Sequence, residues 1–279
     1  MPRKPTPPHE ALRQLQEARS TPFWRKPGLR LTLASVVIVI LMGVFKKKFD
    51  QPVKSPQEQT ELTAPNLNSA KDYFTRAQIY LEHDRPEEAI SDYNHVLKDN
   101  PKSFLAWQGR GQVAFKMGDY PSALADFNQA LSLRPQAMEI LNNRALTYLQ
   151  LGQPSKAVLD YQQALNKSPD SALLMANLGL AHQAAGQGAE ALKAFQEAQQ
   201  LNPDYLLARL FEGNYWLAQK DYRQALPFYD RVLGKRPDQV EAWHNRGLAY
   251  QGLGQCKAAN YDFKQACELG YAKACKQKC

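Results

Sequence analysis

The feature that most constrains this chain is an internal repeat of 34 residues. Proline recurs at that interval without drift, and so do an alanine, an aromatic residue and a small residue. The four ladders are Pro101, Pro135, Pro169, Pro203 and Pro237; Ala89, Ala123, Ala157, Ala191, Ala225 and Ala259; Tyr93, Phe127, Tyr161, Phe195, Tyr229 and Phe263; and Ala77, Gly111, Ala145, Gly179, Gly213 and Gly247. A repeat of this length is one supersecondary unit, which buries its apolar face only by stacking on its neighbours.

The order of residue types within one repeat resembles the tetratricopeptide repeat (TPR) family. A unit of that family has a small residue at position 8, alanine at 20, an aromatic residue at 24 and proline at 32. Placing the proline ladder at position 32 gives six units, which start at Ala70, Phe104, Met138, Ala172, Leu206 and Val240. The resemblance implies an all-α fold over residues 67–279, a right-handed superhelical solenoid of helix–turn–helix units. Residues 271–279 replace the expected sixth proline, and we expect them to form a short polar cap helix.

The turns inside the units carry a conformational signal. Gly118, Gly152, Gly186 and Gly254 recur where a positive φ is expected at the end of a helix. Asp84 stands there in the first unit and tolerates this conformation, whereas Lys220 in the fifth unit does so less readily. We expect Lys220 to cost about 1 kcal/mol.

The N-terminal part is different in composition. Residues 1–66 contain 11 Lys and Arg against 5 Asp and Glu, so their charge is 11 − 5 = +6, whereas residues 67–279 contain 24 against 22, or +2. Residues 1–28 are predicted to be a basic tail, mostly disordered. Residues 29–45 are apolar and end at three lysines, which predicts a single transmembrane helix near the lower length limit. Residues 46–66 are polar and rich in proline, as in an extended linker.

The apolar segment has two readings. A cleaved signal peptide would have a short basic region and a small-residue cleavage site, and three lysines stand at that place instead, so we expect an uncleaved anchor. Over about 15 residues on either side of the uncharged run 31–45, four basic residues precede it, including Arg30, and four follow it. Only the rest of the tail favours a cytoplasmic N-terminus. This orientation would put the repeats in the periplasm of a bacterial inner-membrane protein.

The family implies where a ligand would bind. Its first helices line a concave groove, and positions 2, 5, 9, 12 and 13 face into it. In the third to fifth units these positions, with Asn177 at position 6, give a predicted peptide-binding groove of Asn142, Leu146, Leu149, Leu173, Asn177, Leu180, Leu207, Leu210, Asn214 and Leu217. Leucines on a surface outside the core would be an exposed patch for a protein partner. The alternatives are that packing between repeats absorbs some of them, or that another segment covers them. The lysine of a carboxylate clamp is missing.

All four cysteines lie in the last 24 residues. The stretch from Cys267 to Cys275 is similar to cysteine-rich helical repeats related to TPRs, and this resemblance implies a Cys267–Cys275 disulfide. Cys256 and Cys279 are then available for a second, although the residues alone leave all three pairings of four cysteines open. A zinc site including His244 and four free thiols remain as alternatives. Disulfides would indicate an oxidising compartment, in agreement with periplasmic repeats.

No catalytic, metal-binding or cofactor motif occurs, so we expect a protein that is not an enzyme and uses no cofactor. The near-neutral repeats argue against nucleic acid as a partner. We expect protein or peptide clients, membrane attachment through the N-terminal segment, and no small-molecule substrate. The resulting hypothesis is a membrane-anchored adaptor or scaffold for envelope assembly or secretion. The alternative is a cytosol-facing docking receptor or a regulatory subunit of a membrane-bound complex.

Overall fold

The computed structural model describes residues 69–279, and every regular element in that range is helical. Twelve α-helices are followed by one 3₁₀ turn, η2. Their bounds are α4 Ala70–Glu82, α5 Pro86–Asp99, α6 Phe104–Met117, α7 Tyr120–Leu133, α8 Met138–Gln150, α9 Pro154–Leu165, α10 Ala172–Ala184, α11 Gly188–Leu201, α12 Leu206–Ala218, α13 Tyr222–Lys235, α14 Val240–Gly252, α15 Cys256–Glu268 and η2 Ala274–Lys276. The prediction of an all-helical solenoid is confirmed.

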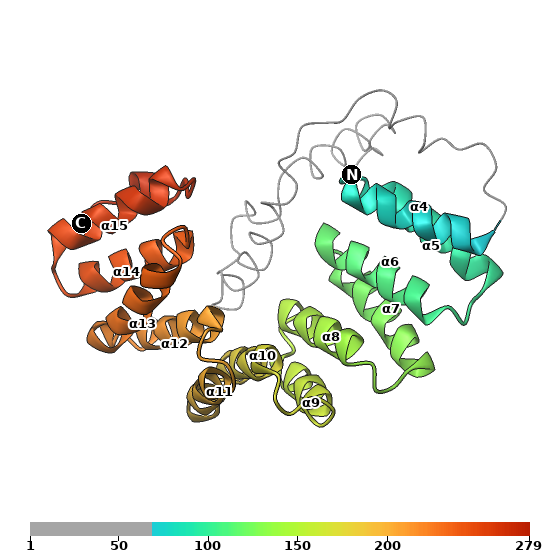
Figure 1. Ribbon diagram of the computed structural model, residues 1–279, viewed down its shortest axis with the longest axis horizontal. Helices are drawn as coiled ribbons and strands as arrows, with labels where there is room; N and C mark the ends of the chain where they lie inside the picture. The colour runs from blue at the N-terminus through green and yellow to red at the C-terminus, as the bar shows by residue number, and fades with distance from the viewer. Residues whose placement is uncertain (1–68) are drawn as a thin grey trace, which may run out of the picture.

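The helices stack as consecutive hairpins along an arc (Figure 1). α8 and α10 lie on the inner side of the arc, and α9 and α11 lie on its outer side (Figure 1). Between residues 69 and 279 no helix has the length and apolar character needed to cross a bilayer. The predicted tail, transmembrane helix and linker (residues 1–28, 29–45 and 46–66) lie outside the described residues.

Local capping explains where several helices begin. Ser69 and Asp72 form a reciprocal capping box at the start of α4, in which the Ser69 side chain accepts from the Asp72 N–H. Ser103 caps α6 and Ser171 caps α10 in the same way, by accepting a backbone N–H of the first turn. Pro86 begins α5, where its missing N–H is harmless because the first turn has no intrahelical acceptor.

The turns adopt the backbone conformation that their sequence predicts. Gly118 ends α6 with φ 81°, and Gly152, Gly186 and Gly254 are also left-handed. Asp84 and Lys220 are the two non-glycine residues with positive φ in the described chain, at 55° and 60°. Lys220 therefore holds a conformation that costs an L-residue about 1 kcal/mol relative to glycine.

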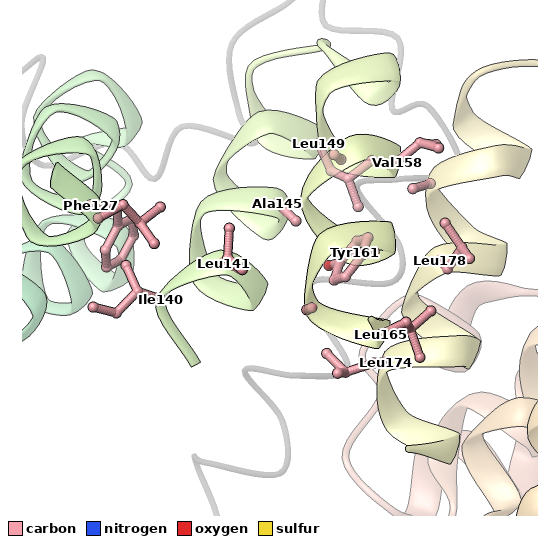
Figure 2. Close-up of a cluster of buried hydrophobic side chains, with 14 of the residues drawn as sticks. Phe127, Ile140, Leu141, Ala145, Leu149, Val158, Tyr161, Leu165, Leu174 and Leu178 are labelled. Carbon is pink, nitrogen blue, oxygen red and sulfur yellow. The ribbon is translucent and has the colours of Figure 1, made fainter. Parts of the chain in front are cut away.

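The ladders of small and aromatic residues form the core. Gly179 lies so close to Phe195 that a Cβ atom added to it would be 2.5 Å from the Phe195 Cε1 atom. The neighbouring alanine, Ala191, and the Phe195 ring are both fully buried. Figure 2 shows the cluster of the preceding hairpins, where Phe127, Tyr161 and Leu178 come from three different hairpins. Stacking therefore buries apolar side chains of neighbouring hairpins together, in clusters that follow one another along the chain.

The prolines of the ladder lie in turns between hairpins, and some of their carbonyl oxygens accept hydrogen bonds from side chains of the next hairpin. Trp107 donates from Nε1 to the Pro101 carbonyl oxygen at 2.9 Å, and Trp243 donates to that of Pro237 at 2.7 Å. Each tryptophan thus ties the first turn of its helix to the turn that precedes it.

The predicted cap helix over residues 271–279 is wrong. The chain leaves α15 through Gly270, which has φ 96°, and then forms only the 3₁₀ turn η2. Two cross-links hold this tail against α15, because Cys267 pairs with Cys275 and Cys256 pairs with Cys279. A tail fixed at both of these points follows α15 and does not form a helix of its own.

Candidate peptide-binding groove

The first helices of successive hairpins, α6, α8, α10, α12 and α14, contact one another and form the inner surface of the arc. This is the surface on which the sequence places the predicted groove. Three of its leucines are buried: Leu149 is 8% exposed, Leu180 is 6% exposed and Leu210 is 1% exposed. The expectation that all seven leucines are exposed is therefore wrong for these three.

Packing between neighbouring hairpins explains the burial. Leu149 lies in the same cluster as Val158 and Ala181, and Leu180 and Leu210 lie together in the next cluster. Because adjacent inner helices touch directly, side chains at their contact belong to the core. The alternative that packing between repeats absorbs part of the groove applies to these positions.

The accessible apolar part of the groove consists of four leucines, which we call the inner strip: Leu146, Leu173, Leu207 and Leu217. Leu173 in α10 is 44% exposed, and the other three are half-buried. Leu207 and Leu217 also pack against the core cluster beneath them, so the protein fixes their positions. The inner strip therefore offers accessible apolar side chains on three successive inner helices, α8, α10 and α12.

The predicted asparagines link successive inner helices. Asn177 donates from Nδ2 to Asn142 Oδ1 at 3.0 Å, and Asn245 donates to Asn214 Oδ1 at 2.8 Å. Asn177 and Asn214 are buried, whereas Asn142 is partly exposed. Of the three predicted groove asparagines, Asn142 is thus the one with accessible surface, and the other two serve mainly to connect hairpins.

A buried carboxyl group accompanies the second amide pair. Asn214 donates from Nδ2 to Glu241 Oε1 at 3.1 Å and accepts from the Tyr229 hydroxyl at 2.9 Å. Burial raises the pKa of Glu241 to about 8, against hydrogen bonds from Asn214 and Asn245 that lower it. Glu241 Oε2 is buried and makes no hydrogen bond to the described residues. Near neutral pH this carboxyl group is therefore largely protonated, which the sequence did not reveal because a glutamate on an inner helix resembles a solvated charge.

A fifth ladder with the same 34-residue period consists of ion pairs, which the sequence alone does not show. Arginine on an inner helix pairs with an aspartate 16 residues later, with N–O distances from 2.6 to 2.8 Å. The pairs are Arg76–Asp92, Arg110–Asp126, Arg144–Asp160 and Arg246–Asp262. The fourth and fifth units have Leu178 and Glu212 at the position of the arginine, so they lack this ion pair. These aspartates are buried and paired with their own hairpin, so they are structural and do not offer charge to a ligand.

The cysteines form two disulfides, Cys256–Cys279 and Cys267–Cys275, and none in the described chain is free. This pairing replaces the zinc and free-thiol alternatives. No group of three or more metal-ligating side chains is found between residues 69 and 279.

Comparison with protein families agrees with this architecture. A model of the tetratricopeptide repeat matches the chain four times, over residues 74–137, 109–172, 176–240 and 211–270. The chain belongs to the tetratricopeptide repeat family. A search of curated proteins found no match to the sequence.

Solved TPR structures share the fold of this TPR protein. PilW, described as a type IV pilus biogenesis factor, has a TM-score of 0.65 and 20% identity, and the match covers 75% of this chain and 97% of PilW. A TPR protein from Parabacteroides merdae has a TM-score of 0.59 and 18% identity, with 73% and 94% covered. MamA from Desulfovibrio magneticus RS-1, residue 41 to its end, has a TM-score of 0.56 and 23% identity, with 62% and 97% covered. At these identities the likeness shows the fold alone.

Proposed function

We propose that this TPR protein is a membrane-anchored adaptor that holds protein clients in its concave groove, as an assembly or secretion factor of the bacterial envelope. The inner strip carries the proposal, because Leu173 is 44% exposed in the middle of a surface formed by successive inner helices. Rigid apolar side chains on a concave surface suit an amphipathic helix or an extended apolar peptide. No catalytic role is proposed.

The proposed location rests on two independent observations. The apolar segment 29–45 is followed by three lysines, as expected for an anchor that is not cleaved. Both disulfides favour an oxidising compartment. Together they support repeats in the periplasm, attached to the inner membrane by the N-terminal segment.

The proposed role in envelope assembly rests on the likeness to PilW and on the predicted anchor. PilW, a type IV pilus biogenesis factor, is matched over 97% of its own length and 75% of this chain. An envelope assembly role for this chain agrees with that likeness and with the anchor. The client remains a protein or peptide, with no nucleic acid and no small-molecule substrate.

The groove is tested by photo-crosslinking in native membranes. A photoreactive amino acid replaces Leu173 in one protein and Leu159 in a matched control. Leu159 is 64% exposed on α9, an outer helix, so it reports contacts on the opposite side of the hairpin. We expect a client to be captured from position 173 and not from 159. Capture from 159 alone would contradict a client in the groove.

A cytosol-facing receptor, or a regulatory subunit of a membrane complex, is the second candidate. It is kept because the uncharged run 31–45 has four nearby basic residues on each side, which do not favour one orientation. Alkylation of thiols in intact cells separates the two. Periplasmic repeats predict that the four cysteines are modified only after reduction. Modification of all four without reductant would favour the cytosolic orientation.

A further inference from the structure

The C-terminal layer, residues 256–279, carries a charge that the rest of the repeats lacks. It contains five lysines against Asp262 and Glu268, or 5 − 2 = +3, whereas residues 69–255 contain 19 basic and 20 acidic residues, or −1. Asp262 is buried in its pair with Arg246, so it does not offset charge at the surface. The near-neutral balance of the whole domain therefore hides a basic end.

The disulfides hold the lysine-bearing tail against α15, which carries the other lysines of this end. Cys275 is bonded to Cys267 near the end of α15, and Cys279 is bonded to Cys256 at its start, so the tail runs back along the helix. The Cys279 backbone N–H also donates to Asn260 Oδ1 at 2.9 Å, between those two points. Lys276 and Lys278 on the tail are thus fixed beside α15.

The helix adds a matching row. Lys257, Tyr261 and Lys264 stand at i, i+4 and i+7 on α15, which puts them on one face. All three are exposed, and Tyr261 is 57% exposed. Within residues 69–279, Lys264 makes a 3.7 Å ion pair with Glu268, and Lys257, Lys273, Lys276 and Lys278 make none.

We propose that this basic end, formed by Lys257, Lys264, Lys273, Lys276 and Lys278, docks on the anionic phospholipid headgroups of the membrane to which the protein is anchored. Each lysine near an anionic bilayer adds electrostatic attraction. Tyr261 and the exposed Leu269 supply an aromatic and an apolar side chain suited to the interfacial region. The proposal rests on the proposed membrane anchoring.

The shape of the arc is compatible with this contact. α4, the first described helix, and α15 lie at the two ends of the arc and on the same side of it, opposite α9 and α11 (Figure 1). A bilayer on that side can meet the basic end while the linker attaches the other end. The solenoid would then stand on the membrane with its groove held in a defined orientation.

The experiment uses the full chain reconstituted in vesicles, either of phosphatidylcholine alone or of phosphatidylcholine mixed with phosphatidylglycerol. A membrane-impermeant acylating reagent modifies exposed lysines, and mass spectrometry gives the rate at each site. We expect acylation of Lys273, Lys276 and Lys278 to be at least about threefold slower on the anionic vesicles, and this protection to disappear in high salt. Lys156 on α9 and Lys193 on α11, on the opposite side of the arc, should show no such change.

Variants make the test specific. The triple variant K273Q/K276Q/K278Q should abolish protection of Lys257, whereas the matched triple variant K156Q/K167Q/K193Q should leave it unchanged. Equal rates on neutral and anionic vesicles, or equal protection of the outer-helix lysines, would overturn the proposal. Protection seen in native membranes but not on protein-free anionic vesicles would also overturn it, in favour of an acidic protein partner. Flotation with neutral vesicles tests the anchor separately, because it depends on residues 29–45 and not on the basic end.

Discussion

The close approach of the small-residue ladder to the aromatic ladder predicts a measurable cost for one added methyl group. In Gly179→Ala the new Cβ atom would lie 2.5 Å from Phe195 Cε1, 2.6 Å from Cδ1 and 3.2 Å from the Ala191 carbonyl oxygen. Carbon atoms in contact are normally separated by about 3.5 Å, so the ring must move by roughly 1 Å. The ring is fully buried, and such overpacking costs about 1–3 kcal/mol.

A second glycine separates this cost from helix propensity. Gly234 lies in α13 with nothing within 4 Å of the Cβ position, so Gly234→Ala should stabilise the helix by about 0.5–1 kcal/mol. The same gain in helix propensity applies to Gly179→Ala and offsets part of its overpacking cost. With an overpacking cost near the upper end of its range, the net loss of unfolding free energy for Gly179→Ala should be about 1–2 kcal/mol.

The assay is urea unfolding followed by far-ultraviolet circular dichroism, with both variants compared with the wild type under the same conditions. The Gly179→Ala midpoint should fall, and the Gly234→Ala midpoint should stay or rise. Adding Phe195→Leu to Gly179→Ala should cost less than Phe195→Leu alone does in the wild type, because the smaller side chain leaves room for the methyl group. If Gly179→Ala is as stable as Gly234→Ala, the close-packing argument is refuted.

Three further predictions concern single side chains. Lys220→Gly should stabilise the protein by about 1 kcal/mol in urea unfolding, because φ is 60° there, whereas Lys220→Ala should give no such gain. Tyr229→Phe should destabilise the protein by about 1 kcal/mol, because the Tyr229 hydroxyl donates to Asn214. Tyr161→Phe should be neutral or stabilising, because the buried Tyr161 hydroxyl has no hydrogen-bond partner among the described residues. The reverse order of stabilities would contradict the hydrogen-bond assignment. Burial raises the pKa of Glu241 to about 8, so the neutral form is favoured on folding and its contribution to stability is lost as pH rises from about 4.5 through 8. Glu241→Gln should therefore gain stability relative to the wild type between pH 5 and pH 8, and a difference that does not change with pH would argue against a buried neutral carboxyl group.

The helices could be predicted from the sequence because their signals are local or strictly periodic. The ladders place Ala191 and Phe195 in the core, and glycine or aspartate marks most of the turns. Both signals depend on contacts inside one hairpin, which repeat along the chain. The left-handed Lys220 was predicted in the same way, from its place in the period.

The groove was predicted less well because exposure there depends on contacts between hairpins. Leu173 and Leu180 are both leucines on the inner side of α10, yet one is 44% exposed and the other 6% exposed. The position of a residue within its repeat unit does not determine how closely the next inner helix approaches it, so its exposure cannot be predicted from that position. The inner strip therefore contains only four of the seven leucines that the sequence predicts to be accessible.

The polar features were missed for related reasons. The pairing of Arg144 with Asp160 has the repeat period, but a charged residue on a helix is more often solvated, and the sequence does not show which charges are paired. The basic end was hidden because Lys278 is distant from Lys257 in the sequence. The Cys256–Cys279 bond brings the two regions together, and only the path of the tail reveals it.

The central claim, that clients bind the inner strip, is tested most directly by the affinity of a captured client for two charge variants. Leu173→Glu places a carboxylate in the groove, and Leu159→Glu places the same group on an outer helix that is also exposed. Loss of one apolar contact and burial of a charge should weaken client binding by about tenfold or more for Leu173→Glu. Leu159→Glu should bind as the wild type does. Equal affinity for both variants would contradict the account.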